Sequence, residues 1–144
     1  MTTLTERARA IFANDLYATT LTGVVIDNVE PECTICSLQL TAHHRNAKNA
    51  VMGGVFFTLA DLTFAIAAHT DMLSESESKH ITLKWVSTNS NISFLAQPHG
   101  DSITARSTCI KKGRSQAVYQ ISITDSDNRL VAIVTTTGLM TAGM

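Results

Sequence analysis

The chain has 144 residues, of which 44% are hydrophobic and 16% are charged. This length fits one domain with a sizeable apolar core, and the composition excludes a disordered or fibrous chain. Eleven Lys and Arg residues against twelve Asp and Glu residues give a net charge of −1, which disfavours a broad nucleic-acid-binding face. We therefore expect a single domain over residues 1–144 that does not bind nucleic acid.

The N-terminal segment predicts a short amphipathic helix over residues 4–17. Apolar side chains recur at helical spacing at Leu4, Ala8, Ile11, Phe12 and Leu16. The first ten residues are polar and charged overall, so we expect no secretory signal there. This absence favours a cytoplasmic protein.

Two β-rich segments, 24–29 and 33–40, flank a turn-like Glu-Pro-Glu sequence and predict a β-hairpin. Within the second segment, Cys33 and Cys36 have the C-x-x-C spacing of redox and zinc sites. Residues three apart on a strand point to opposite faces, however, and the sequence contains no second C-x-x-C pair. With an odd count of three cysteines, the sequence predicts neither a disulfide framework nor a metal site.

A polar loop at residues 41–52 leads into an apolar segment that predicts a central helix over about 53–72. The stretch 49–70 carries a single charge, Asp61, and a carboxylate at bilayer depth is costly, so we expect no membrane span. Apolar side chains occupy nearly every direction around this helix. A sheet and a partner subunit are therefore expected to cover it.

Four strand-like segments follow, at residues 80–94, 102–110, 115–124 and 129–139. Their short, turn-prone connections predict a four-stranded antiparallel meander. Apolar residues in the first segment change from odd to even positions, so we expect a β-bulge near residues 87–90. The predicted fold class is α+β, with one curved antiparallel sheet wrapped around the long central helix.

Asp61 is the most informative residue, because a lone carboxylate among apolar neighbours needs a partner, a cleft or a proton. Two interpretations are open. The carboxylate is structural, capped by a hydroxyl or directed to solvent, or it is an acid or base with a pKa tuned by burial.

Met52, Gly53 and Gly54 precede the central helix, where free backbone N–H groups can bind a phosphate or polarise a carbonyl oxygen. Simple turn formation is the more frequent reason for a glycine pair before a helix. Asp61 follows Gly53 by eight residues, or roughly 12 Å along a helix. One substrate carbonyl could meet both residues only if a two-fold dimer brought them together from different chains.

Lys111, Lys112, Gly113 and Arg114 form a basic turn between two predicted strands. Such a turn can contact a polyphosphate, and Arg114 could bind it in bidentate fashion. A solvated turn that prevents edge aggregation is the competing interpretation.

Several short motifs resemble those of hotdog-fold acyl-CoA thioesterases of the phenylacetate-degradation type. Asn46, Met52-Gly53-Gly54 and Leu59-Ala60-Asp61 resemble the N-x5-H-G-G…L-A-D pattern of that family. The later strand motifs of the family correspond to Val86-Ser87, Asn91-Ile92-Ser93-Phe94, Pro98, Gly113-Arg114 and Val131-Ala132. The likeness covers about residues 20–140 and implies a hotdog fold.

The resemblance implies a role for each matched residue. Gly53 would donate its backbone N–H to the thioester carbonyl, and Asn46 would help to place the thioester or the water. Asp61 of the opposing subunit would be the nucleophile or the general base, and Ser87 would orient the water. The residues expected to bind the substrate are Met52, Gly54, Lys111, Lys112, Gly113 and Arg114. Of these, Lys111, Lys112 and Arg114 would meet the phosphates of coenzyme A. No separate cofactor is implied, and the expected assembly is a homodimer that pairs further into a tetramer.

One departure is that Met52 occupies the position where the family usually has His. Methionine forms no strong hydrogen bond, so any contact made by that His is lost. The five histidines of the chain do not replace it by position and are expected at the surface: His43, His44, His69, His80 and His99.

The leading interpretation is hydrolysis of an acyl-CoA to a free acid and coenzyme A. Phe56, Phe57 and Phe64 would suit an aryl or medium-chain acyl group, but they could equally form the core. The alternative is a hotdog protein that binds acyl-CoA without hydrolysing it, which Met52 favours and Asp61 opposes. A dehydratase or hydratase ranks third, since His69 is poorly placed on the helix to pair with Asp61.

Overall fold

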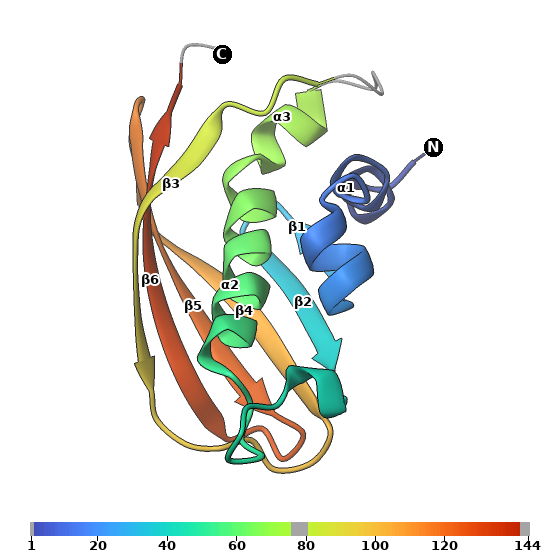
Figure 1. Ribbon diagram of the computed structural model, residues 1–144. Coiled ribbons are helices and arrows are strands. Elements are labelled where there is room, and N and C mark those ends of the chain that lie inside the picture. Colours follow the sequence, from blue (N-terminus) through green and yellow to red (C-terminus); the bar gives the residue numbers. More distant parts are fainter. Residues whose placement is uncertain (1, 76–80, 142–144) are drawn as a thin grey trace.

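Six strands form one antiparallel sheet that curves around helix α2 (Gly53–Ala68) in the computed structural model, which describes residues 2–75 and 81–141 (Figure 1). The strands are β1 (Val25–Glu30), β2 (Cys33–Gln39), β3 (Trp85–Phe94), β4 (Ser102–Lys112), β5 (Gln116–Asp125) and β6 (Leu130–Met140). Helix α1 (Leu4–Phe12) lies beside β1, and α3 (Thr70–Glu75) follows α2. The α+β class and the sheet wrapped around the central helix are confirmed.

The strand order is β1-β2-β4-β5-β6-β3, so β4, β5 and β6 form an antiparallel meander as predicted, but the predicted place of β3 beside β4 is wrong. Strand β3 pairs with β6 rather than with β4, and β4 pairs with β2. The connection through α2 and α3 carries the chain from β2 to the opposite edge of the sheet, where β3 lies. The link from β3 to β4 then returns the chain to the middle of the sheet, between β2 and β5. The rule that short connections join neighbouring strands does not anticipate this return.

Helix α1 ends at Phe12 rather than at residue 17. The side-chain amide of Asn14 donates to the Ile11 carbonyl at 3.3 Å, and the Asp15 N–H bonds the Phe12 carbonyl instead of continuing the α-helical pattern. Asn and Asp compete with the helix for its own backbone groups in this way. The chain then forms a separate π-helical segment, η1 (Tyr17–Thr22).

The central helix also ends earlier than predicted, because His69 interrupts it. Its ring Nδ1–H donates to the Ala65 carbonyl at 2.6 Å, and its Nε2 accepts the backbone N–H groups of Lys84 and Trp85 at 3.0 and 2.9 Å. This buried ring joins the end of α2 to the start of β3. The expectation that His69 lies at the surface is therefore wrong.

The buried His69 predicts a pH-dependent stability. Desolvation lowers its pKa below the ordinary 6.5, so the unfolded chain binds more protons as the pH falls below that value. The stability contribution is present above pH 6.5 and is lost on acidification, at up to about 1.4 kcal/mol per pH unit. In thermal melts between pH 7.5 and 5, His69→Gln should show a shallower fall in Tm than the wild type. A parallel fall would contradict this role, and the exposed His43→Gln should behave like the wild type.

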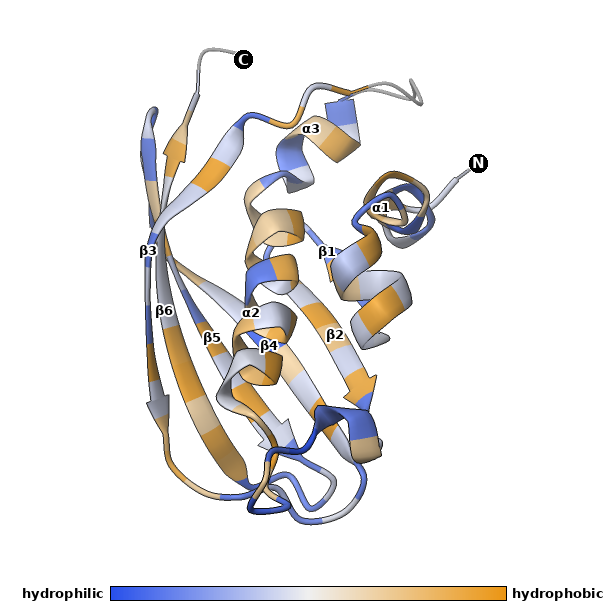
Figure 2. Cartoon of the chain, in the orientation of Figure 1, coloured by the Kyte–Doolittle hydropathy of each residue, from blue (hydrophilic) through white to orange (hydrophobic). Residues whose placement is uncertain are grey.

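Helix α2 packs its apolar residues onto the concave face of the sheet. Figure 2 shows that α2 and the strands behind it are both rich in hydrophobic residues, drawn in orange. Phe56 and Phe64 belong to this core, whereas Phe57 is 37% exposed. A stripe formed by Gly54, Thr58 and Asp61 faces outward. The helix is thus less completely covered by its own chain than its apolar composition suggests.

Two smaller predictions can be checked in the sheet. The register between β3 and β6 shifts between Ser87 and Asn89, which confirms the bulge. Cys36 is buried while Cys33 is half-buried on the other face of β2, so the two thiols do not face each other. No helix within residues 2–75 and 81–141 is long and apolar enough to cross a membrane.

Candidate active site

The outward stripe of α2 faces η1 across a groove that we call the α2 groove. Its middle part has a volume of about 350 Å³ and is lined by Asp15, Tyr17, Ala18, Phe57, Thr58, Asp61, Leu62 and Ser90. A second part, of about 510 Å³, reaches the start of α2 and is lined by Tyr17, Leu21, Thr22, His43, His44, Met52, Gly54, Val55 and Thr58. The two parts share Tyr17 and Thr58, so one groove joins the start of α2 to Asp61.

Asp61 projects from α2 into this groove, where Ser87 Oγ donates a hydrogen bond to its Oδ1 at 3.4 Å. Partial burial raises the pKa of Asp61, the Ser87 hydrogen bond lowers it, and the nearby Asp15 carboxylate raises it again. A carboxylate with a raised pKa and a hydroxyl partner is suited to accept a proton or to attack an electrophile. Asp61 thus has both the partner and the cleft that the sequence requires for it.

Ser87 reaches Asp61 because β3 lies close to α2 at the bulge. Its partner in β6 is Gly138, and a Cβ on that glycine would stand 2.5 Å from the ring of Phe64 in α2. The absence of a side chain at Gly138 lets the helix approach β3 and β6 closely. Asp61 and Ser87 are brought together within one chain.

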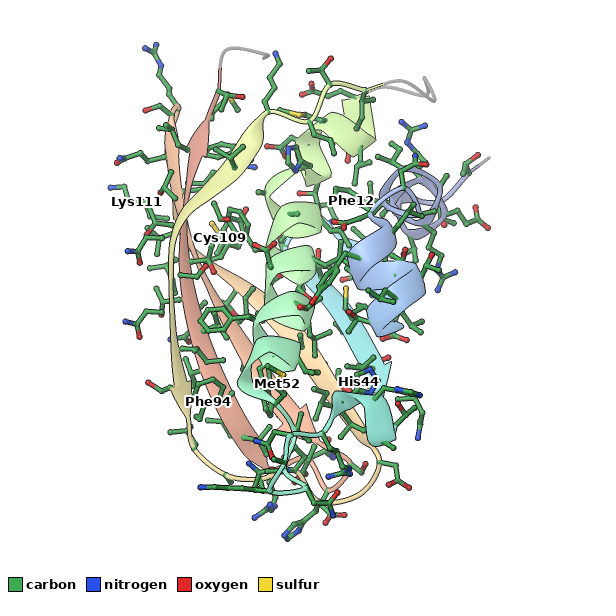
Figure 3. The ribbon with its side chains drawn as sticks, viewed as in Figure 1. Phe12, His44, Met52, Phe94, Cys109 and Lys111 are labelled. Carbon is green, nitrogen blue, oxygen red and sulfur yellow. The ribbon has the colours of Figure 1, made fainter. Side chains whose placement is uncertain are left out.

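At the start of α2, Met52 is the N-cap residue and is exposed to the groove. The first N–H groups of a helix lack intrahelical acceptors, and no bond of the described residues engages the N–H of Gly53 or Gly54. A Cβ at Gly53 would lie 3.0 Å from Phe94 Cζ, whereas one at Gly54 would meet nothing within 4 Å. Met52 and Phe94 both lie toward this end of the helix in Figure 3.

Asn46 shapes the loop that leads to this helix start. Its Oδ1 accepts the backbone N–H groups of Lys48 and Ala50 at 2.9 and 3.1 Å. The oxygen is therefore engaged within the loop, which leaves the Nδ2 group of the exposed side chain to contact a substrate.

His44 is buried, so its expected surface position is wrong. Its Nδ1 accepts the Thr41 N–H at 2.9 Å, which leaves Nε2–H to donate to the Thr22 carbonyl at 2.7 Å. Its own carbonyl accepts the Met52 N–H at 2.9 Å. His44 thereby fixes the start of α2 against the end of η1. His43 and His99 are exposed as predicted, while His80 lies outside the described residues.

The basic turn between β4 and β5 divides into two parts. Lys112 Nζ donates to the Ala68 carbonyl at 2.9 Å, pairs with Asp71 at 3.2 Å and lies 5.4 Å from the Trp85 ring centroid. Lys112 therefore caps the C-terminal end of α2. Lys111 and Arg114 remain exposed, and the Gly113 N–H closes the turn on the Gln116 carbonyl at 2.7 Å.

The single chain does not assemble all the predicted site residues in one place. Gly53 and Asp61 lie on the same unbroken helix, with the roughly 12 Å separation that eight residues impose. Asn46, Met52, Gly53 and Gly54 gather at one end of α2, and the basic turn lies at the other. Within residues 2–75 and 81–141, no group of three His, Cys, Asp or Glu residues could hold a metal.

Sequence reasoning missed the contribution of η1 to the groove. Asp15 and Tyr17 line it, yet both fall within a segment interpreted as the end of the first helix. The Asn14-Asp15 pair, which disfavours helix interiors, is the local feature that could have indicated this break.

Comparison with known proteins places these features in a family. Residues 48–132, more than half of the chain, match the Thioesterase superfamily. The chain is 28% identical over 129 residues to the acyl-coenzyme A thioesterase PaaI of Escherichia coli, an alignment that covers 89% of this chain and 84% of the relative. It is 30% identical over 90 residues to a putative esterase of Archaeoglobus fulgidus, covering 62% of this chain and 53% of that protein.

Solved structures agree with the fold. The E. coli PaaI protein superimposes with a TM-score of 0.79 at 22% identity, covering 99% of both chains. A thioesterase family protein from Silicibacter pomeroyi gives a TM-score of 0.79 at 18% identity, covering 96% of this chain and 98% of that one. The chain therefore has the hotdog fold and belongs to the thioesterase superfamily.

Proposed function

We propose that this protein hydrolyses acyl-CoA thioesters to a free acid and coenzyme A. The observation that carries the proposal is Asp61, whose carboxylate has a raised pKa, a Ser87 partner and access to the α2 groove. The similarity of the chain to a protein named as an acyl-coenzyme A thioesterase supports the same reaction. Tyr17, Phe57 and Leu62 give the groove an apolar lining suited to an acyl group.

The proposed chemistry begins at the start of α2. The Gly53 N–H polarises the thioester carbonyl and stabilises the negative charge that develops on its oxygen. Asp61 of the opposing subunit then acts in one of two ways. As a general base it takes a proton from a water that attacks the carbonyl carbon, and as a nucleophile it forms an anhydride that water cleaves. In both cases the C–S bond breaks, and the coenzyme A thiolate takes up a proton.

The assembly follows from the separation of Gly53 and Asp61. In a two-fold dimer, Gly53 and Asn46 of one subunit would meet Asp61 and Ser87 of the other, which gives two equivalent sites. Further pairing into a tetramer, a cytoplasmic location and independence from a metal or separate cofactor belong to the same proposal.

The test is a thiol-release assay over aryl, short-chain and long-chain acyl-CoAs. Release from at least one class at a rate that scales with protein concentration is expected. The alternative, a protein that binds acyl-CoA without hydrolysing it, is favoured by Met52 in place of the usual His of the family. It predicts saturable acyl-CoA binding without thiol release. That result would overturn the hydrolytic proposal.

A further prediction separates the two parts of the basic turn. Arg114→Ala with Lys111→Ala should raise KM by about tenfold and weaken its salt dependence, with kcat nearly unchanged, because phosphate contacts stabilise ground and transition states alike. Lys112→Ala should instead lower Tm, since it removes the contacts to Ala68, Asp71 and Trp85. Steady-state kinetics at two salt concentrations, together with thermal melts, measure both effects. An unchanged KM in the double variant would contradict the phosphate role.

A further inference from the structure

A second carboxylate, that of Asp15, lines the α2 groove together with Asp61. Asp15 lies between α1 and η1, and its backbone is held on both sides. Its N–H donates to the Phe12 carbonyl at 3.0 Å, and its carbonyl accepts the N–H and the hydroxyl of Thr19 at 3.0 and 2.9 Å. The position of this exposed residue is therefore fixed by three hydrogen bonds.

The Asp15 side chain, in contrast, has no intramolecular partner. Across residues 2–75 and 81–141, no ion pair or side-chain hydrogen bond engages its carboxylate. The middle part of the groove is lined by two carboxylates and contains no Lys, Arg or His. Such a groove has a negative electrostatic potential, which its concave, partly desolvated shape strengthens.

This charge distribution has a consequence for the acyl group. An uncharged acyl chain can pack against Tyr17, Phe57 and Leu62 without meeting a like charge. An acyl group that ends in a carboxylate would bring a third negative charge beside Asp15 and Asp61, with no cation among the residues of the same chain that line this part of the groove. The two carboxylates do not form a metal site, because no third ligand of the His, Cys, Asp or Glu type joins them in the described part of the chain.

We propose that Asp15 is a specificity-determining residue that excludes negatively charged acyl groups from the α2 groove, so that the substrates are acyl-CoAs with uncharged acyl chains. This inference rests on the proposed function, since it assumes that the groove receives the acyl part of an acyl-CoA. Asp15 selects among substrates and takes no part in the bond-breaking step. The effect of its charge on Asp61, whose pKa it raises, is consistent with their proximity.

The test uses two thioether analogues that cannot be hydrolysed, S-hexyl-CoA and S-(5-carboxypentyl)-CoA, which differ in a terminal carboxylate. Isothermal titration calorimetry on the full chain measures both affinities. The wild type should bind the hexyl analogue at least about tenfold more tightly than the carboxylated analogue. Asp15→Asn should bind the carboxylated analogue more tightly than the wild type does and should keep the wild-type affinity for the hexyl analogue. The ratio of the two affinities should therefore fall to about threefold. Asp61 remains to account for the residual discrimination.

Asp27→Asn is the matched control, because it removes the same charge from an exposed position on β1 outside the groove. This control should keep the wild-type ratio. If the wild type bound both analogues equally, or if Asp15→Asn kept the wild-type ratio of affinities, the role of Asp15 would be overturned. The proposed function would be unaffected by that result. Binding of neither analogue by the wild type would overturn the proposed function, and this inference with it.

Discussion

Replacement of Asp61 by Asn is expected to lower kcat by about 10² or more with little change in KM. Asparagine keeps the size of the side chain and can still contact Ser87 Oγ, but it can neither accept a proton from water nor attack a thioester. The loss should therefore fall on the transition state rather than on substrate binding. Steady-state thiol release and a thermal melt on the same preparation measure the effect and check the fold.

Ser87→Ala provides the graded comparison, since it removes one long hydrogen bond to the carboxylate and leaves Asp61 in place. Its kcat should fall less than that of Asp61→Asn. If Asp61→Asn retained nearly the wild-type kcat, Asp61 would be a structural carboxylate rather than an acid or base.

Mixing two inactive variants should restore activity if each site is shared between subunits. One chain carries Asp61→Asn and the other carries Asn46→Asp, which keeps an acceptor oxygen for the Lys48 and Ala50 N–H groups and removes the Nδ2 donor. In the heterodimer, one site combines the intact Asn46 of one chain with the intact Asp61 of the other, and the second site has both changes. Each heterodimer should therefore regain about half of the wild-type activity.

The measurement requires subunit exchange, purification of the heterodimer through two different affinity tags, and a thiol-release assay. Each homodimer variant, taken through the same exchange alone, is the control and should stay inactive. A folded heterodimer without activity would contradict the shared site. A variant homodimer that is active alone would instead show that its substitution does not remove a required group.

The sequence by itself determined which segments form strands and where the central helix begins. Alternating apolar residues and turn sequences marked the β1–β2 hairpin, and the change from odd to even positions located the bulge at Ser87. These features depend on residues that are close in the chain, so local patterns are sufficient. The same holds for Asp61, which is conspicuous because its immediate neighbours are apolar.

Only the tertiary structure decided the strand order and the partners of single side chains. The pairing of β3 with β6 depends on how the whole connection through α2 and α3 crosses the face of the sheet, which connection length alone does not encode. His69 and Lys112 are of residue types that usually lie at the surface. His69 nevertheless bonds the backbone N–H of Trp85, and Lys112 bonds the carbonyl of Ala68. Both backbone groups are distant in the sequence, and only tertiary packing brings them close. The α2 groove has the same origin, because Asp15 and Asp61 meet in it only after η1 packs against α2.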